Sequence, residues 1–434
     1  MENRLKGILV GVYPATGLGD LVQYVTAVLT LLNNVKDVHL DVSIPNYILA
    51  RKYVSRIMNC RNVMLIRGLF ECSLKGEGVW VRSFKGIRSR NLLDCIRRMF
   101  VSSNVFLEYG VPVLSKAMNN AYDFGCIGGH SVDDNAVKSS GIVSATTYYR
   151  GARSIVKGSL VLFPCSITNT INLIHLKKVK LFKEALQKFD LVCVRGFYSR
   201  KTLEKFIDSS RIIISPDTTF AIRTLFRDLY VNFNKGHKDK YRVTLVLRRD
   251  YFINFNQISK YSVYLKTLLH LVEMLYTRYD IETILLIHEI FEDSKAVKDF
   301  IKLLKRNKHR DSINVIIPKD LFEDMRWLMS SDVVISSRLH AGLIPLSMGI
   351  PTFFILPRND IRILDVFSLL RLDLNFFVID IFSPAEINGL SKKVIDVVED
   401  ISKYKSTIEH AVNRTEKLVF LPAKILVNLI YQQC

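Results

Sequence analysis

The sequence predicts an α/β protein with parallel sheets, and two observations carry that prediction. Short apolar runs rich in β-branched residues recur along the chain without the alternation of polar and apolar residues that a half-exposed strand shows. Between these runs, apolar residues repeat at helical spacing. Strands that are buried on both faces and separated by helices are typical of a doubly wound α/β architecture.

The predicted strands fall into two series. The first occupies residues 8–12, 63–66, 124–127, 160–163, 191–194 and 212–214. The second occupies residues 243–247, 284–287, 315–317, 333–335 and 352–355. Helical spacing is clearest over 18–32, with Asp20 as the candidate N-cap, and over 297–304 behind Asp293.

A polar, lysine-rich stretch at 232–240 separates the two series and is the candidate linker. We therefore expect an N-terminal α/β lobe at residues 1–231, a C-terminal α/β lobe at 241–384 and a helical tail at 385–434. A two-lobed enzyme of this kind binds its substrates in the cleft.

The composition narrows the function classes. The 434 residues carry 61 Lys and Arg against 41 Asp and Glu, a net charge of +20 that favours anionic partners such as phosphorylated substrates or lipid headgroups. Seven scattered cysteines without metal-type spacing indicate a reducing compartment and no structural metal. With no secretory signal or membrane span in the sequence, we expect a cytoplasmic protein, free or peripheral at a membrane.

The first candidate site is the turn from Thr16 to Asp20, between a predicted strand and a helix. Gly17 and Gly19 let the backbone approach a ligand, and the free N–H groups of a helix start can bind an anion or a sugar. A tight turn with Asp20 as a cap is an equally good interpretation. The third glycine of a dinucleotide fingerprint is absent, which disfavours NAD binding.

A second candidate is Gly128, Gly129 and His130, which close the predicted strand at 124–127. Ligands of open α/β sheets lie beyond the carboxyl ends of strands, where the two glycines are expected. A lone loop histidine is more often simply solvated.

The most informative segment is 331–355, which reads as strand, polar turn, helix, glycine stop and strand. Arg338 and His340 stand at the turn into the helix, beside Ser337 and Leu339. Arginine offers a two-pronged donor to a carboxylate or phosphate, and histidine can move a proton near neutral pH. The alternative is an arginine that caps a carbonyl and a histidine satisfied inside the core.

This segment resembles the signature of the polysaccharide pyruvyltransferase family, an Arg-Leu-His run before a small-residue helix and then Gly-x-Pro. The matching residues are Ser337–Ala341 and Gly349–Pro351. A thinner likeness extends over most of the chain, through Gly17–Asp20, Gly128–Gly129, Cys193–Ser199, Pro216–Asp217 and Asn359–Arg362. Arg362 stands where the family usually has lysine.

The resemblance implies an enzyme with two Rossmann-like lobes of the glycosyltransferase-B type, the acceptor on the N-terminal lobe and the donor on the C-terminal lobe. It implies a pyruvyltransferase that uses phosphoenolpyruvate as donor substrate, without cofactor or metal. The acceptor would be a sugar diol of a cell-surface glycan or of its lipid-linked precursor, converted to a pyruvate ketal. Arg338 and Arg195 are then candidates for the anion clamp, His340 for the acid/base, and Ser337, Leu339 and Arg362 for substrate contacts.

Two alternatives remain at this point. Gly17–Asp20 followed by an apolar helix also resembles heptosyltransferase-type glycosyltransferases, which would make the donor a nucleotide sugar. A basic nucleic-acid-binding protein is disfavoured, because the sequence has no zinc finger, RNP-like aromatic run or basic repeat.

A strongly basic segment adds an expectation about membranes. Residues 82–100 contain six cations against the single acid Asp94, with Trp80 and Phe84 near the start. A solvated surface is the usual meaning of such a charge run. Because basic clusters are attracted to anionic bilayers, the segment is also the candidate for peripheral contact with a membrane that holds a lipid-linked acceptor.

Overall fold

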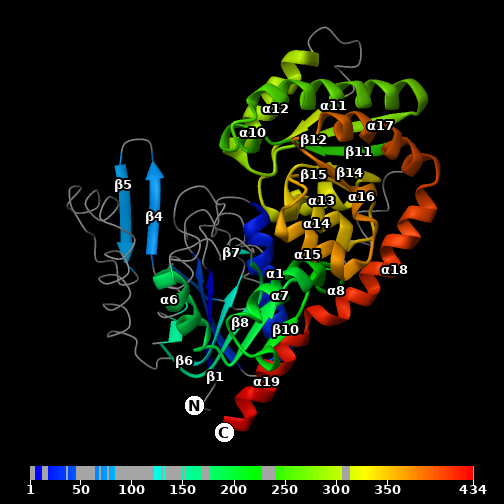
Figure 1. Ribbon diagram of the computed structural model, residues 1–434. Coiled ribbons are helices and arrows are strands. Elements are labelled where there is room, and N and C mark those ends of the chain that lie inside the picture. Colours follow the sequence, from blue (N-terminus) through cyan, green and yellow to red (C-terminus); the bar gives the residue numbers. More distant parts are fainter. Residues whose placement is uncertain are drawn as a thin grey trace. The chain divides into compact units, whose positions relative to one another are not determined.

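The structure is a computed structural model, and it describes residues 5–11, 18–35, 38–44, 64–67, 70–75, 78–83, 122–128, 131–132, 149, 152–153, 155–167, 176–226, 240–304 and 313–433 (Figure 1). Contacts divide the chain into two compact units. Unit 1 comprises Met1–Thr16, Gln23–Thr218 and Lys417–Cys434, and unit 2 comprises Gly17–Val22 and Thr219–Glu416. The expected lobe boundaries at 231, 241 and 385 stay predictions.

Unit 1 contains a parallel sheet with the strand order β10-β9-β8-β6-β1-β2-β3, and β7 pairs with β8. Its strands are β1 (Leu5–Gly11), β2 (Val38–Ile44), β3 (Met64–Arg67), β6 (Tyr122–Gly128), β7 (Ser131–Val132), β8 (Val156–Ile167), β9 (Leu191–Val194) and β10 (Ile212–Ile214). A separate antiparallel hairpin consists of β4 (Phe70–Lys75) and β5 (Gly78–Ser83).

Apolar strands and helices together make the core of unit 1. Ile8, Phe124 and Val192, on three different strands, are fully buried, as strands covered on both faces require. The helices are α1 (Leu18–Asn34), whose first turn belongs to unit 2, α6 (Leu176–Leu186), α7 (Phe197–Leu203) and α19 (Leu421–Gln433). The C-terminal α19 contacts β8, so the end of the chain is part of this unit.

Unit 2 contains a second parallel sheet with the order β13-β12-β11-β14-β15-β16. Its strands are β11 (Tyr241–Val246), β12 (Ile281–Leu286), β13 (Ile313–Ile316), β14 (Val333–Ser336), β15 (Thr352–Leu356) and β16 (Val378–Asp380). The helices are α8 (Ile222–Leu225), α10 (Asp250–Asn254), α11 (Ile258–Arg278), α12 (Ile290–Leu304), α13 (Leu321–Met329), α14 (Leu339–Ser347), α15 (Ile361–Leu370), α16 (Leu374–Phe377), α17 (Pro384–Glu399) and most of α18 (Ile401–Val419). Figure 1 shows α11 and α17 on one face of this sheet and α13 and α14 on the other.

Each sheet has one point where the strand order reverses direction. In unit 1 this point lies between β1 and β6, and in unit 2 between β11 and β14. The loops that leave two such neighbouring strands part to opposite faces of the sheet, which leaves room for a ligand beyond their carboxyl ends. Gly128 ends β6, and Arg338 follows β14, so both lie at these points.

The predicted fold class is confirmed: two α/β units with parallel sheets, and helices at the C-terminal end. The strands of both predicted series are present; β9 and β10 have the predicted bounds, and the ends of the others are shifted. β2 was missed because its sequence, VHLDVSI, alternates polar and apolar residues although it pairs with parallel strands on both sides. β16 was missed because its three residues directly follow α16, so no polar turn separates its apolar residues from those of the helix.

Two helices begin earlier than predicted. α1 begins at Leu18, so Asp20 lies in its first turn and is not its cap. α12 begins at Ile290, and Asp293 caps it from inside the first turn, where one carboxylate oxygen accepts a hydrogen bond from the backbone N–H of Glu289 at 2.7 Å. Within the ranges described, no helix is both long and apolar enough to cross a bilayer.

The close approach of α14 to β15 depends on a glycine. A Cβ on Gly342 would lie 2.3 Å from the ring of Phe354, which is fully buried on β15. A Cβ on Gly389, in α17, would meet nothing within 4 Å. We expect Gly342→Ala to lower the unfolding free energy by about 1–3 kcal/mol, since overpacking outweighs the gain in helix propensity.

The matched control Gly389→Ala should raise the unfolding free energy by about 0.5–1 kcal/mol, because alanine is the better helix former and has room there. Chemical denaturation of both variants measures the difference. Equal effects of the two substitutions would contradict the packing of α14 on β15.

Candidate functional site

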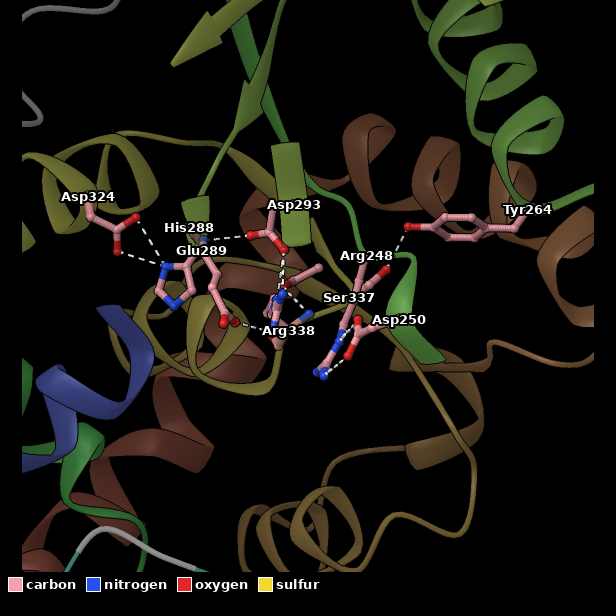
Figure 2. A network of polar contacts seen from close by, with 10 residues as sticks. Arg248, Asp250, Tyr264, His288, Glu289, Asp293, Asp324, Ser337 and Arg338 are labelled. Atoms are coloured by element: carbon pink, nitrogen blue, oxygen red, sulfur yellow. Dashed lines mark hydrogen bonds and ion pairs between the residues drawn. The ribbon is translucent and has the colours of Figure 1, made fainter. Parts of the chain in front are cut away.

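Charged and polar side chains of unit 2 gather beyond the carboxyl ends of three parallel strands (Figure 2). Arg248 follows β11, His288 and Glu289 follow β12, and Ser337 and Arg338 follow β14. β11 and β14 are the neighbours between which the strand order reverses, and ligands of α/β sheets bind at such points. This cluster is the candidate site.

The turn from β14 into α14 fixes the backbone of Arg338. The hydroxyl of Ser336 accepts a hydrogen bond from the Arg338 N–H at 3.0 Å and donates one to the Arg338 carbonyl at 2.7 Å. Arg338 is the N-cap residue of α14 and has an extended backbone, with φ −118° and ψ 131°. Its side chain therefore leaves the helix start and points to α12 (Figure 2).

Arg338 is held by two carboxylates. Its Nη1 lies 2.5 Å from Oε2 of Glu289, and its Nε and Nη2 lie 2.9 and 2.7 Å from Oδ1 of Asp293. Asp293 is fully buried, and Arg338 is 9% exposed. Charge-assisted bonds of this kind are strong because the surroundings are poorly solvated. The positive charge of Arg338 is thus already compensated inside the protein.

His288 is paired with a buried aspartate. Its Nδ1 lies 3.1 and 3.0 Å from the two carboxylate oxygens of Asp324, which is in the first turn of α13. Only 3% of His288 and none of Asp324 is exposed. Burial opposes the charged imidazolium, but the Asp324 carboxylate outweighs it and raises the pKa of His288 above its ordinary value of 6.5.

The other side of the His288 ring faces the first turn of α1. A Cβ built on Gly19 would lie 2.9 Å from Nε2 of His288, 2.8 Å from Cβ of His340 and 3.2 Å from Nδ1 of His340. No side chain fits at position 19, because real Cβ atoms do not approach other atoms so closely. Nε2 of His288 and Nδ1 of His340 lie 2.9 and 3.2 Å from the position that this Cβ would take. The two nitrogens are therefore at most 6.1 Å apart.

Two further contacts complete this edge of the sheet. Arg248 pairs with Asp250 and lies over the ring of Tyr251, 4.0 Å from its centroid. The buried hydroxyl of Tyr264 bonds to Oγ of Ser337 at 2.8 Å. The Ser337 hydroxyl is therefore used in a hydrogen bond within unit 2.

Arg362 lies next to the Arg248 contacts. Its Nε is 2.9 Å and its Nη2 2.5 Å from the carboxylate of Asp360, the N-cap of α15. The same Nη2 donates to the Tyr251 hydroxyl at 3.1 Å. Tyr251 thus contacts both Arg248 and Arg362, and the predicted substrate residue Arg362 belongs to the same cluster.

The family model described as polysaccharide pyruvyl transferase matches residues 18–359. That range contains Gly19, His288, Arg338 and His340, and Arg362 lies just beyond its end. The chain belongs to the polysaccharide pyruvyl transferase family. The predicted family membership is thereby confirmed, and the family is one of enzymes.

Solved structures with a similar fold share little sequence with this pyruvyl transferase family member. A UDP-GlcNAc 2-epimerase from Neisseria meningitidis bound to UDP-GlcNAc has a TM-score of 0.56 and 12% identity, covering 99% of this chain and 100% of that chain. The Methanocaldococcus jannaschii UDP-GlcNAc 2-epimerase in complex with UDP-GlcNAc and UDP has a TM-score of 0.54 and 12% identity, covering 98% and 99%. UGT73P12 from Glycyrrhiza uralensis, complexed with glycyrrhetinic acid 3-O-monoglucuronide, has a TM-score of 0.57 and 7% identity, covering 99% and 96%. No curated protein matches the chain.

The pyruvyl transferase signature residues differ in their surroundings. Arg338 and His340 lie together at the start of α14, as the sequence predicts, whereas Leu339 between them is 5% exposed and packs inside unit 2. In unit 1, Gly128 ends β6 at the switch point. Gly17, Gly129 and His130 lie outside the described residues, and of Asp20 the structure describes the backbone within α1.

Arg195, the second predicted clamp residue, lies in a buried network of unit 1. Its Nε is 2.8 Å from Oδ2 of Asp217, and its Nη2 donates to Oε1 of Gln23 at 3.0 Å. Arg195 is 2% exposed and Asp217 is fully buried. These contacts give Arg195 a role in holding unit 1 together, and donor binding by this residue stays a prediction.

Sequence reasoning missed His288, Glu289, Asp293 and Asp324 as site residues. His288 and Glu289 directly follow the apolar run predicted as the strand at 284–287, so the rule that ligands lie beyond strand ends could have found them. Asp293 was considered only as a helix cap. Asp324 gives no local signal, because its partner is 36 residues away in the sequence.

The His288–Asp324 pair makes stability depend on pH. Folding raises the pKa of His288 through Asp324 despite burial, and burial raises the pKa of Asp324. The folded state therefore holds more protons than the unfolded state. The contribution of His288 to stability is full below pH 6.5 and is lost as the pH rises through the pKa of folded His288, and the contribution of Asp324 falls in the same direction from pH 3.8 upward. Each pKa unit of upward shift corresponds to about 1.4 kcal/mol.

We expect the unfolding free energy of the wild type, relative to the double variant His288→Gln/Asp324→Asn, to decrease between pH 6 and pH 9. The double variant removes both titrating groups and is the reference. Denaturant unfolding at several pH values measures the difference. A difference that stays constant or grows with pH would show that the pair does not hold a proton in the folded state.

Proposed function

We propose that this protein transfers the enolpyruvate-derived group of phosphoenolpyruvate to two hydroxyls of a sugar, forming a cyclic pyruvate ketal and releasing phosphate. Membership of the polysaccharide pyruvyl transferase family supports pyruvyl transfer to a glycan. The observation that carries the donor assignment is the grouping of Arg338, His340 and His288 at the switch point of unit 2. The acceptor is the sugar of a cell-surface glycan or of its lipid-linked precursor.

The chemistry sets the demands on the site. Protonation of C3 of phosphoenolpyruvate makes C2 an oxocarbenium centre, which one hydroxyl attacks. Phosphate then leaves C2, and the second hydroxyl closes the ketal. The donor carries a carboxylate and a phosphate, so the site needs cations, and the proton movements need an acid/base group. Arg338 supplies the N–H groups of Nη1 and His340 an imidazole, and the scheme uses neither cofactor nor metal.

Glu289 is the contact of Arg338 that an anionic donor can replace. The Glu289 side chain is 16% exposed and contacts Nη1, while Asp293 is fully buried, contacts Nε and Nη2 and also bonds to a backbone N–H. Removing a buried partner leaves an uncompensated charge, which costs about 3–5 kcal/mol. A donor carboxylate would therefore displace Glu289 from Nη1 and leave the Asp293 contacts in place.

A nucleotide sugar is the competing donor. The epimerases of similar fold were solved with UDP-GlcNAc, which supports this candidate at the level of the fold. A ligand that binds only the folded state at 100 times its Kd raises stability by about 2.7 kcal/mol. Thermal melting with phosphoenolpyruvate and with UDP-GlcNAc separates the two candidates. We expect a shift with phosphoenolpyruvate, and a shift with UDP-GlcNAc alone would overturn the proposal.

The cytoplasm and the membrane surface are the proposed location. A lipid-linked acceptor would be presented at a bilayer, and the net charge of +20 favours anionic headgroups. Most of the basic segment proposed to make this contact, residues 84–100, lies outside the described residues, and the side chains of 82 and 83 are not described either.

His340 provides the sharpest test of the chemistry. We expect His340→Gln to lower kcat for phosphate release from phosphoenolpyruvate by ~10²-fold or more, because a positioned acid/base group contributes that much. His270→Gln, which changes a largely exposed histidine on α11, is the matched control and should keep the wild-type rate. The assay follows inorganic phosphate in the presence of a sugar diol acceptor. Wild-type turnover by His340→Gln would exclude His340 from the reaction.

A further inference from the structure

The first part of the proposed reaction contains two proton transfers at different atoms. C3 of phosphoenolpyruvate gains a proton, and the attacking hydroxyl loses one. One imidazole can serve these two transfers only in turn and from one position, whereas two imidazoles can serve them from two positions. The question is therefore whether the site holds a second proton-handling group beside His340.

His288 has the geometry of the second group. Its Nδ1 is held by Asp324, which leaves Nε2 on the opposite side of the ring. Nε2 points at Gly19, to the same point that Nδ1 of His340 approaches. An imidazole oriented by a carboxylate through one nitrogen, with the other directed to the reacting atoms, is the arrangement that acid/base histidines use.

We propose that His288, held by Asp324, donates the proton to C3 of phosphoenolpyruvate, while His340 accepts the proton of the attacking hydroxyl. This inference rests on the function proposed above. It assigns to the Asp324–His288 pair a task that the family signature around Arg338 does not cover.

The step balances in atoms and electrons. The N–H bond at Nε2 of His288 breaks, and the π electrons of the enol form the C3–H bond. A lone pair of the hydroxyl forms the bond to C2, and its proton moves to His340. The bond from C2 to the phosphate oxygen then breaks with its electrons on that oxygen, which takes the proton of the second hydroxyl as the ketal closes. Solvent returns the proton from His340 to His288.

Charged groups from three helices surround His288. Asp324 on α13 and Asp293 on α12 favour the imidazolium, whereas Arg338 at the start of α14 opposes it. His340 on α14 and the backbone of Gly19 on α1 lie on the Nε2 side. The carboxylate in direct contact is Asp324, so its removal is the change that lowers the proton affinity of His288 most.

The pH profile of kcat tests the assignment in the full-length protein. His288 must be protonated and His340 unprotonated, so the wild type should show a bell-shaped profile for phosphate release from phosphoenolpyruvate. Asp324→Asn keeps the size of the side chain and removes its charge, so we expect the alkaline limb to move down by about one pH unit or more. His288→Gln should lower kcat by ~10²-fold or more, with KM for phosphoenolpyruvate changed much less.

Asp332→Asn is the matched control. Asp332 precedes β14, and its carboxylate bonds to the Arg242 N–H at 2.9 Å, at the amino end of the sheet and away from the site. We expect this variant to keep the wild-type alkaline limb. A thermal melt of each variant establishes that it is folded at the assay temperature.

The outcomes separate the inference from the proposed function. A wild type that releases no phosphate from phosphoenolpyruvate overturns the proposed function, and the inference with it. A wild type that turns over but shows no alkaline limb between pH 6 and pH 9 overturns the inference alone, whether or not the variants fold. Asp324→Asn with an unmoved limb, or His288→Gln with wild-type kcat, does the same. A moved limb in Asp324→Asn but not in Asp332→Asn supports it.

Discussion

The buried ion pair between Arg338 and Asp293 is the interaction on which the rest of the site depends. It joins the cap of α14 to the first turn of α12, and Asp293 also fixes the turn after β12 through the backbone of Glu289. A fully buried carboxylate needs a partner of this quality, because its desolvation costs more than a weak contact returns. Arg338, which the family signature implies as part of the anion clamp, is therefore also part of the buried structure of unit 2. A variant without Arg338 loses a structural ion pair as well as a candidate donor contact, so its activity alone does not distinguish the two roles.

Local charge at the site differs from the charge of the whole protein. The net charge of +20 draws anions toward the molecule over long distances. Around Arg338, however, three carboxylates from Glu289, Asp293 and Asp324 face two cations once His288 is protonated, so the cluster has a net charge of −1. A phosphorylated donor binds there only if it displaces a carboxylate or brings further cations into play, and the partly exposed Glu289 is the carboxylate placed for such an exchange.

Local sequence patterns predicted the positions of the strands and of the signature residues. They did not predict which other residues the strand order brings next to them. Continuous apolar runs located the strands, and the polar turn at 336–340 located Arg338 and His340 beyond one of them. Glu289 and Asp293, which hold Arg338, come from the turn after β12 and from α12, and they arrive because β12 neighbours β11 and β11 neighbours β14. No local sequence pattern indicates the order of the strands in this sheet. Arg195, which the motif singled out for a ligand, contacts Asp217 and Gln23. No local pattern indicates these contacts, because they depend on the packing of β9, β10 and α1, and binding of a donor by Arg195 stays a prediction.

Gly19 shows that a glycine at a helix start can be required for more than one reason. The turn at 16–20 suggested a glycine that lets a ligand approach the backbone. In the structure Gly19 lies inside the first turn of α1, and its missing side chain leaves room for the rings of His288 and His340. The rings of His288 and His340 therefore lie against the start of α1. A methyl group at this position would lie within 2.9 Å of both side chains, so packing within unit 2 by itself requires glycine here, and the approach of a ligand to Gly19 stays a prediction.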